Sequence, residues 1–330
     1  MSKTTVLCHE GEYIGDVETG CLHVASIMEP IVHHIHEPVT GTWQYIVCDP
    51  QSKVSVIIDA VLDYSKDSGM IRTASADQLL EVVTSNDYIV SHILETHAHA
   101  DHLTASRYLQ EVLAARQPAH RPLLCIGNGI SQVQATMGGI YNIQAREMQD
   151  SFNHTFSDGE EFSIGNLKAT IMHLPGHTPD HIGYLIGSNV FAGDSIFNAD
   201  VGSGRCDFPG GDAVALYRST QKLLQLPGHY KIYTGHDYPP KDRCGPDGKE
   251  TGAVPYTTVE VQSRENKHVK TGTTMEEFVR WRRERDSTLL EPKLLRQAMH
   301  VNVRGGRLPA GPVEGFLIEQ KPAGVRTAAA

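Results

Sequence analysis

The fold of the chain is decided by residues 96–102, which read THAHADH. They follow an apolar run at 89–94 and precede a helix-like stretch at 103–109. A strand that ends here releases the polar side chains into a loop that the sheet below holds still, so that ring nitrogens and a carboxylate can converge on a metal. A polar loop with histidines present by chance is the alternative. The spacing favours a metal site with these candidate ligands: His97, His99, Asp101 and His102.

Three further candidate ligands each follow a predicted strand. His177 follows the strand at 167–172, which a Gly-Asn turn joins to the strand at 161–164; Asp194 follows the strand at 190–192, and His236 the strand at 231–234. Ligands from the ends of four separate strands are typical of a sandwich that builds its site along one edge and keeps its interior apolar.

These residues permit two metals. The first position would be formed by His97, His99 and His177, and the second by Asp101, His102 and His236. Asp194 would bridge them. A pair of zinc or iron ions in such a site activates water for hydrolysis by lowering its pKa towards ~7.

The remaining elements predict an α/β fold. We expect further strands at 42–48, 54–58, 122–126 and 182–186, and helices at 76–84, 212–224 and 275–285. A helix starting at 130 is expected to break at Gly138-Gly139, and residues 59–64 to leave their strand for a loop. We divide the chain into an N-terminal extension (1–27), a catalytic domain (28–255) and a C-terminal helical cap with a disordered Ala-rich tail (256–330), packed on the same domain.

Composition narrows the class of protein. With 330 residues, 40% of them hydrophobic, the chain can bury a large core. No run approaches the ~18 apolar residues of a membrane span. The net charge of −10 argues against a nucleic-acid partner, because phosphate contacts need a basic surface. Six scattered cysteines without a CxxC pair indicate a reducing compartment. We therefore expect a cytoplasmic protein; the mitochondrial matrix is the alternative, although no transit peptide is visible.

A set of five motifs resembles the persulfide dioxygenases, relatives of glyoxalase II in the metallo-β-lactamase-fold superfamily. They are THAHADHL at 96–103, PGHTP at 175–179, GRCDF at 204–208, LPG at 226–228 and HDY at 236–238. The first pattern alone is shared by many hydrolases, whereas the last motifs in this order are more specific. The resemblance runs from about residue 28 to residue 309 and implies an αββα four-layer sandwich.

The resemblance also implies a cofactor and a reaction. In that family, counterparts of His97, His177 and Asp194 hold one Fe(II), and this face of two imidazoles and a carboxylate leaves positions for both a substrate and O₂. The implied reaction oxidises glutathione persulfide with O₂ and water to sulfite and glutathione. A homodimer is left open. The other candidate ligands then orient metal ligands and water through hydrogen bonds: His99, Asp101, His102 and His236.

The alternative function is a glyoxalase II-like hydrolase that cleaves a glutathione thioester with two metals. A third reading, a non-catalytic protein that binds a persulfide or a metal, is disfavoured because a full ligand set at strand ends usually marks a working site.

Three residues are candidates for substrate binding. Tyr238 lies beside the ligand-rich loop and is expected to hydrogen-bond the substrate. Arg304 and Arg307 are candidates for binding a substrate carboxylate, with structural ion pairs as the commoner use of such arginines.

Other residues near the motifs have expected supporting roles. Arg205 and Asp207 are expected to form a structural pair in the glycine-rich loop, and Asp237 to brace its own loop. Cys206 has no base to activate it and is expected to be an ordinary small side chain. His181 adds an imidazole that the family resemblance does not predict.

Overall fold

The computed structural model describes residues 28–243 and 252–328. The N-terminal extension at 1–27 and part of the loop at 239–255 lie outside the described residues. None of the helices within the described ranges is long and apolar enough to cross a membrane.

The first sheet has six strands in the order β1-β2-β3-β6-β8-β9. β1 to β3 pair antiparallel, whereas β3, β6, β8 and β9 are parallel, so the carboxyl ends of the parallel strands meet at one edge. The strands are β1 (Ile31–Glu37), β2 (Thr42–Cys48), β3 (Val54–Ile58), β6 (Ile89–Leu94), β8 (Leu123–Gly127) and β9 (His154–Phe156).

The second sheet also has six strands, in the order β10-β11-β12-β13-β14-β15. All neighbours pair antiparallel except β13 and β14, which are parallel. The strands are β10 (Glu161–Ile164), β11 (Leu167–His173), β12 (Ile182–Ile186), β13 (Asn189–Phe191), β14 (Lys231–Tyr233) and β15 (Tyr256–Thr258).

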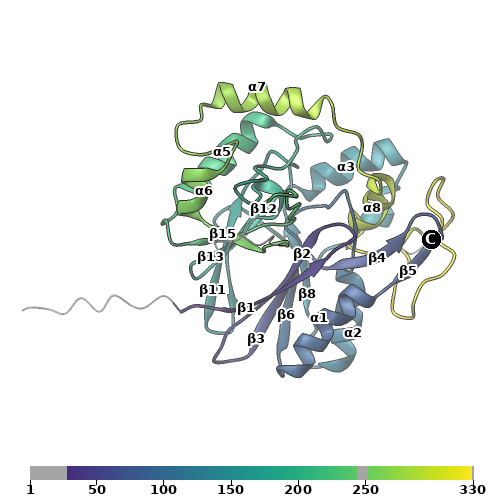
Figure 1. Ribbon diagram of the computed structural model, residues 1–330. Helices are drawn as coiled ribbons and strands as arrows, with labels where there is room; N and C mark the ends of the chain where they lie inside the picture. The colour runs from purple at the N-terminus through teal and green to yellow at the C-terminus, as the bar shows by residue number, and fades with distance from the viewer. Residues whose placement is uncertain (1–27, 244–251, 329–330) are drawn as a thin grey trace, which may run out of the picture.

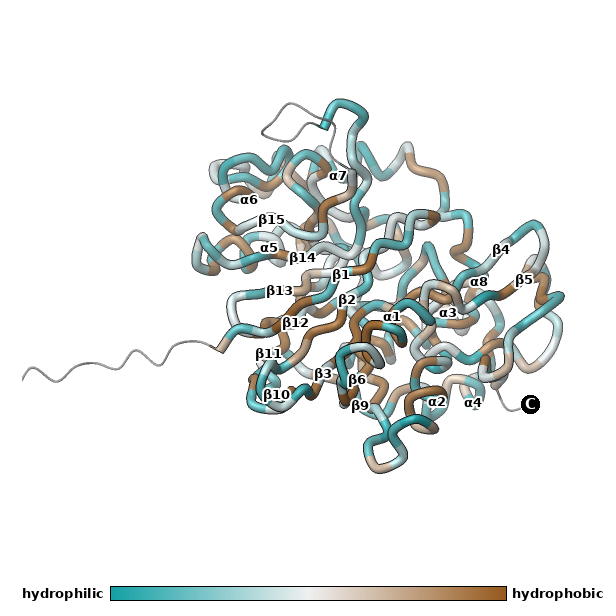
Figure 2. The backbone as a smooth tube through the Cα atoms, turned by 60° about the horizontal axis from the view of Figure 1, so that its bottom comes forward, coloured by the Kyte–Doolittle hydropathy of each residue, from teal (hydrophilic) through white to brown (hydrophobic). Residues whose placement is uncertain are grey.

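The two sheets pack face to face with helices on both outer faces (Figure 1). Alternation along each strand sends Tyr45 and Val47 of β2 into the core between the sheets and Ile46 into the core under the helices α1 (Ala74–Ser85) and α2 (Ser106–Arg116). On the other side, α5 (Ala213–Leu224), α6 (Val259–Glu265) and α7 (Met275–Asp286) cover the second sheet. Apolar residues follow the central strands in Figure 2. The predicted αββα four-layer sandwich is confirmed.

Two stretches differ from the sequence prediction because of tertiary pairing. Residues 61–65, predicted to be loop, form β4 (Val61–Ser65), which pairs with β5 (Met70–Arg72) and with β7 (Leu103–Thr104) in a small third sheet. Helix α2 therefore starts at Ser106, after the first residues of the stretch predicted to be helical.

Helix α3 (Ile130–Tyr141) continues through Gly138-Gly139, where we predict a break. The helix ends instead at Tyr141, and the next residue, Asn142, caps it in a left-handed conformation with φ 54°. At Gly138 a Cβ would lie 3.0 Å from Met148 Cε, so the glycine makes room for the short helix α4 (Ala145–Met148). Gly138, which we predict to break the helix, therefore serves the close packing of α3 against α4.

The C-terminal part adds α8 (Leu295–Asn302), which packs against α3 and β7. In the Ala-rich tail, predicted to be disordered, Thr327 pairs with Leu308, and the Ala328 N–H donates to the Leu308 carbonyl at 2.7 Å. The prediction of disorder is therefore wrong for these two residues.

Candidate metal centre

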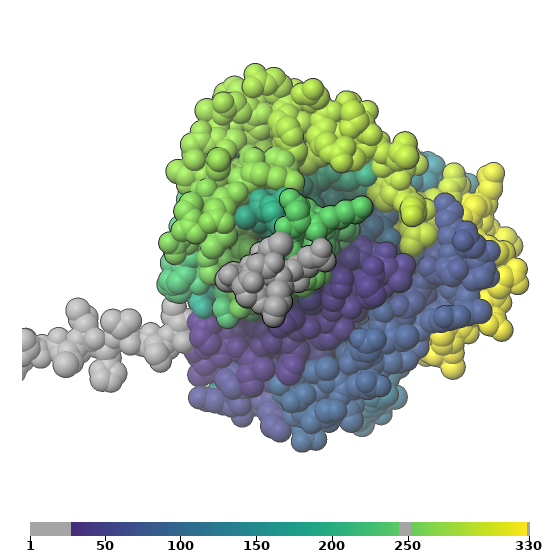
Figure 3. Space-filling model, viewed as in Figure 1, coloured from purple at the N-terminus to yellow at the C-terminus, as the bar shows by residue number. Residues whose placement is uncertain are grey.

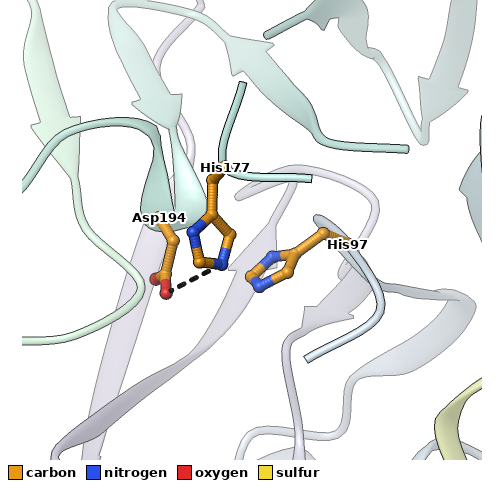
Figure 4. A group of neighbouring side chains, drawn as sticks. All are labelled: His97, His177 and Asp194. Atoms are coloured by element: carbon orange, nitrogen blue, oxygen red, sulfur yellow. Dashed lines mark ion pairs between the residues drawn. The ribbon is translucent and has the colours of Figure 1, made fainter. Parts of the chain in front are cut away.

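The structure brings the predicted metal ligands together at the edge of the sandwich. Ligand atoms of His97, His177 and Asp194 all lie within 4.8 Å of one another, although they come from the loop after β6, the loop after β11 and the 3₁₀ turn η1 (Gly193–Ser195) after β13. Figure 4 shows the three side chains pointing toward one another, with 3.6 Å between His177 Nε2 and Asp194 Oδ2.

The remaining candidate ligands form a second group next to the first. Ligand atoms of His99, Asp101 and His102 also lie within 4.8 Å of one another. His236 Nε2 lies 3.3 Å from Asp101 Oδ2 and 3.6 Å from Asp194 Oδ1. Asp194 therefore lies between the two groups, with one oxygen toward each.

Each histidine of the first group commits one ring nitrogen to the protein and turns the other inward. His97 Nδ1 lies 3.0 Å from the Thr96 hydroxyl, and His177 Nδ1 donates to the Arg205 carbonyl at 2.6 Å. His97 Nε2 is buried without a hydrogen-bond partner among the described residues.

Histidines of the second group likewise pair one ring nitrogen with the protein and leave the other facing inward. His99 directs Nε2 to Asp59 Oδ1 at 3.1 Å and Glu95 Oε2 at 3.3 Å, and His102 donates from Nδ1 to the Leu103 carbonyl at 3.2 Å. Among the candidate ligands, further buried atoms without a hydrogen-bond partner within the described ranges are His99 Nδ1, Asp101 Oδ2, His102 Nε2, Asp194 Oδ1 and His236 Nε2. Buried polar atoms are rarely left without partners, so these inward atoms fit one or two metal ions.

Protonation differs between the histidines. Burial, helped by neighbouring histidines, lowers the pKa of His97 well below its usual value and that of His102 to about 4. Burial also acts to lower the pKa of His99, but Asp59 and Glu95 outweigh it and raise this pKa well above 6.5. His97 and His102 are thus in the neutral form that binds metals, whereas His99 must release a proton.

A cavity of about 1350 Å³ opens onto the metal ligands. Figure 3 shows this face hollowed between the yellow-green segment of the C-terminal cap and the purple turn between β1 and β2. His177, Asp194 and His236 line its floor, and Tyr238 stacks on the His236 ring with centroids 5.6 Å apart. Six cationic side chains also line the cavity: Lys66, Arg205, Lys267, Arg282, Arg285 and Lys293.

The residues with expected supporting roles have the following surroundings. Arg205 donates two hydrogen bonds to Asp207, at 2.6 and 2.5 Å, and a third to the Leu290 carbonyl. Asp237 pairs with Arg243 and accepts the Val254 N–H at 2.7 Å. Cys206 is buried in an apolar cluster.

Arg304 and Arg307, predicted to bind a substrate carboxylate, contact groups of the protein instead. Arg304 is 2% exposed and donates to Glu147 at 2.7 Å, and Arg307 donates to the Gln149 carbonyl at 2.7 Å. Within the described part of the chain, neither residue lines the metal cavity. Arg304 thus holds α4 and Arg307 holds the residues directly after it, so both have structural contacts, the use named as the alternative.

Sequence reasoning missed two buried carboxylates beside His99. Asp59 and Glu95 directly follow β3 and β6, parallel neighbours whose carboxyl ends meet at the metal edge. Their position in the sequence could have identified them, because polar residues directly after parallel strands gather at one edge of a sheet.

Comparison with known proteins adds the family. Residues 37–236 match the family model of the metallo-beta-lactamase superfamily. The chain belongs to this superfamily. The identification confirms the fold and the superfamily expected from the motifs, and it accounts for the metal-ligand pattern.

Individual relatives point to two branches. The chain is 40% identical over 273 residues to "Glyoxylase B2" of Dictyostelium discoideum, covering 82% of this chain and 89% of that protein. It is 28% identical to the human mitochondrial "Persulfide dioxygenase ETHE1", covering 63% of this chain and 68% of that protein. The crystal structure of ETHE1 from Myxococcus xanthus superposes with a TM-score of 0.63 at 29% identity, covering 84% of this chain and all of that one.

Proposed function

We propose that the chain is an Fe(II)-dependent persulfide dioxygenase that oxidises glutathione persulfide with O₂ and water to sulfite and glutathione. The observation that carries the proposal is the grouping of His97, His177 and Asp194, of which His177 and Asp194 line the cavity. Two imidazoles and one carboxylate on one face are the ligand set of non-haem Fe(II) oxygenases. The similarity to ETHE1 proteins supports the same branch.

The cavity supports an anionic thiol substrate. Although the chain carries a net charge of −10, cationic side chains gather at the rim, among them the exposed Lys66, Lys267 and Lys293. Glutathione persulfide is an anion with two carboxylates, so this local field favours its entry. Tyr238, half exposed at the cavity wall, can hydrogen-bond the bound substrate.

The iron, held by His97, His177 and Asp194, would supply the site at which persulfide sulfur and O₂ react. The protein supplies orientation and a water-poor floor. Thr96 and the Arg205 carbonyl fix the ring orientations of His97 and His177. Phe197 and Phe208 line the same cavity and limit the water beside the reacting sulfur. One persulfide, one O₂ and one water yield glutathione, sulfite and two protons.

A two-metal hydrolase acting on a glutathione thioester is the second candidate. The observation that favours it is the position of Asp194, which lies between the two ligand groups and directs one oxygen to each. The 40% identity to Glyoxylase B2 supports it as well.

Oxygen uptake distinguishes the two functions. Protein loaded with iron under anaerobic conditions is mixed with glutathione persulfide in an oxygen-electrode chamber, and sulfite is measured at the end. The dioxygenase consumes one O₂ for each sulfite formed. Cleavage of S-lactoylglutathione without persulfide-dependent oxygen uptake would replace the first proposal by the second.

A further inference from the structure

The turn at residues 178–181 connects the loop that carries His177 to strand β12, and the proposed function gives it no role. Its last two residues, Asp180 and His181, are both 0% exposed. Their side chains reach the two other loops that carry metal ligands. We propose that Asp180 and His181 are positioning residues that hold these two loops against the His177 loop, so that the ligand set is assembled before a metal binds.

Asp180 fixes the first loop. Its Oδ2 accepts the backbone N–H of Ala98 at 2.7 Å. Ala98 stands between His97 and His99, so this hydrogen bond fixes the backbone from which both imidazoles project. A carboxylate that accepts a backbone N–H in a buried site makes a strong, charge-assisted bond.

His181 fixes the third loop and contacts the first. Its Nε2 accepts the backbone N–H of Asp194 at 2.9 Å, and its Nδ1 lies 3.2 Å from the Ser195 hydroxyl. The ring also stacks on the His97 imidazole, with centroids 4.8 Å apart and planes 21° apart. One side chain therefore contacts two of the three residues proposed to hold the iron.

Glycines make room for this turn. At Gly129 a Cβ would lie 2.7 Å from Asp180 Cα, and at Gly193 it would lie 2.7 Å from His181 Nε2. Gly193 also has φ +47°, a conformation that side chains rarely adopt. The backbone is thus free of side chains at the points where the turn approaches it most closely.

A purely structural role would give a different result from a positioning role. If the two side chains only stabilised the sandwich, their removal would lower the unfolding temperature and leave the metal affinity of the folded protein unchanged. If they position the ligands, metal affinity falls even at temperatures where the metal-free variant is fully folded, because binding must then also order the loops.

The experiment uses full-length, metal-free Asp180→Ala and His181→Phe proteins. His181→Phe keeps a ring against His97 but cannot accept the Asp194 N–H. Affinities for Zn(II), and for Fe(II) under anaerobic conditions, are measured by chelator competition, with circular dichroism to establish folding. We expect each variant to bind about 10–100-fold more weakly than wild type. Asp180→Asn and His181→Gln, which keep an acceptor, should recover part of the loss.

Asp49→Ala is the matched control. Asp49 is also 0% exposed and accepts a backbone N–H, that of Asn166, at 2.7 Å, but it follows β2 at the end away from the metal ligands. The Asp49→Ala protein should be less stable than wild type and should keep its metal affinity.

Wild-type affinity in Asp180→Ala and His181→Phe, or a loss no larger than that of Asp49→Ala, would overturn the proposal. If the two variants do not fold, the absorption spectra of the Co(II)-substituted conservative variants decide instead: spectra identical to wild type would equally overturn it. Metal binding is measured without substrate, so the outcome is independent of whether the site performs dioxygenation or hydrolysis.

Discussion

The two groups of ligands at the edge of the sandwich differ in what holds their imidazoles. In the first, His97 and His177 pair with neutral oxygens, those of the Thr96 hydroxyl and the Arg205 carbonyl. In the second, His99 faces two buried carboxylates, which raise its pKa in spite of its burial. His97 is therefore in the neutral form that binds a metal at neutral pH, whereas His99 must give up a proton first.

The largest expected effect comes from Asp194, the residue that both groups share. Asp194→Ala removes the sole carboxylate of the first group together with the charge that offsets the metal, so we expect iron affinity to fall by more than about 100-fold. Elemental analysis of protein prepared with iron and without added zinc measures this. Asp200→Ala, which removes a more exposed carboxylate paired with Arg243, is the control and should keep its iron. Unchanged iron in Asp194→Ala would show that the ligand assignment is wrong.

Substitution of His236 distinguishes a site that holds one metal from a site that holds two. If only the first group holds a metal, wild type carries about one iron per chain, and His236→Ala keeps most of it with a loss of about 10–100-fold in affinity or activity. If both groups hold metals, wild type carries about two and the variant about one. Metal content by mass spectrometry of both proteins decides the count. A fall from two to one would exclude the mononuclear site.

The candidate ligands that the structure brings together could be predicted from sequence because they lie in short motifs directly after strands. THAHADH contributes four of them in seven residues, and the Pro-Gly turn before His177 is equally local. The same strands predicted a sandwich with its site along one edge, and the family resemblance implied its αββα layering.

The residues that hold the ligands could not be predicted in the same way. Asp59 lies 40 positions from His99, and their contact depends on the parallel pairing of β3 with β6. Residue type alone makes Arg304 and Arg307 candidates for binding a substrate, and only the packing of α4 against the segment after α8 shows what they contact. Long-range pairing therefore carries information that a motif lacks.

The pH dependence of metal uptake sharpens the comparison between the groups. Because its pKa is raised, His99 stays protonated at pH values above 6.5, and this proton competes with a metal for Nδ1. Metal uptake by the second group should therefore weaken as the pH falls through the raised pKa of His99. In metal-free protein the sign for stability is opposite: the protonated His99 stabilises the fold below pH 6.5, and this contribution is lost as the pH rises through the folded-state pKa.

Glu95→Gln tests this explanation. It removes one of the two negative charges beside His99, so the proton is held less tightly and the uptake of a second metal should begin at lower pH. Titration of Zn(II) content against pH by mass spectrometry measures the shift. Glu147→Gln, at a carboxylate that pairs with Arg304 away from the metal edge, should leave the curve in place. Identical curves for wild type and Glu95→Gln would mean that the carboxylates do not control His99.

The smallest expected effect comes from Thr96, whose hydroxyl is one of the two neutral oxygens that pair with the imidazoles of the first group. Thr96→Val removes the hydroxyl that lies 3.0 Å from His97 Nδ1 and donates to Asp59 Oδ2 at 2.9 Å. A neutral hydrogen bond contributes about 1 kcal/mol, which corresponds to roughly fivefold in metal affinity. Thr96→Ser keeps the hydroxyl and should bind iron as wild type does. The loss should be smaller than that of Asp194→Ala and should not depend on pH near neutrality, because burial keeps His97 unprotonated there. A pH-dependent loss would indicate that Thr96 acts through Asp59 on His99, in which case the two groups share one hydrogen-bond network.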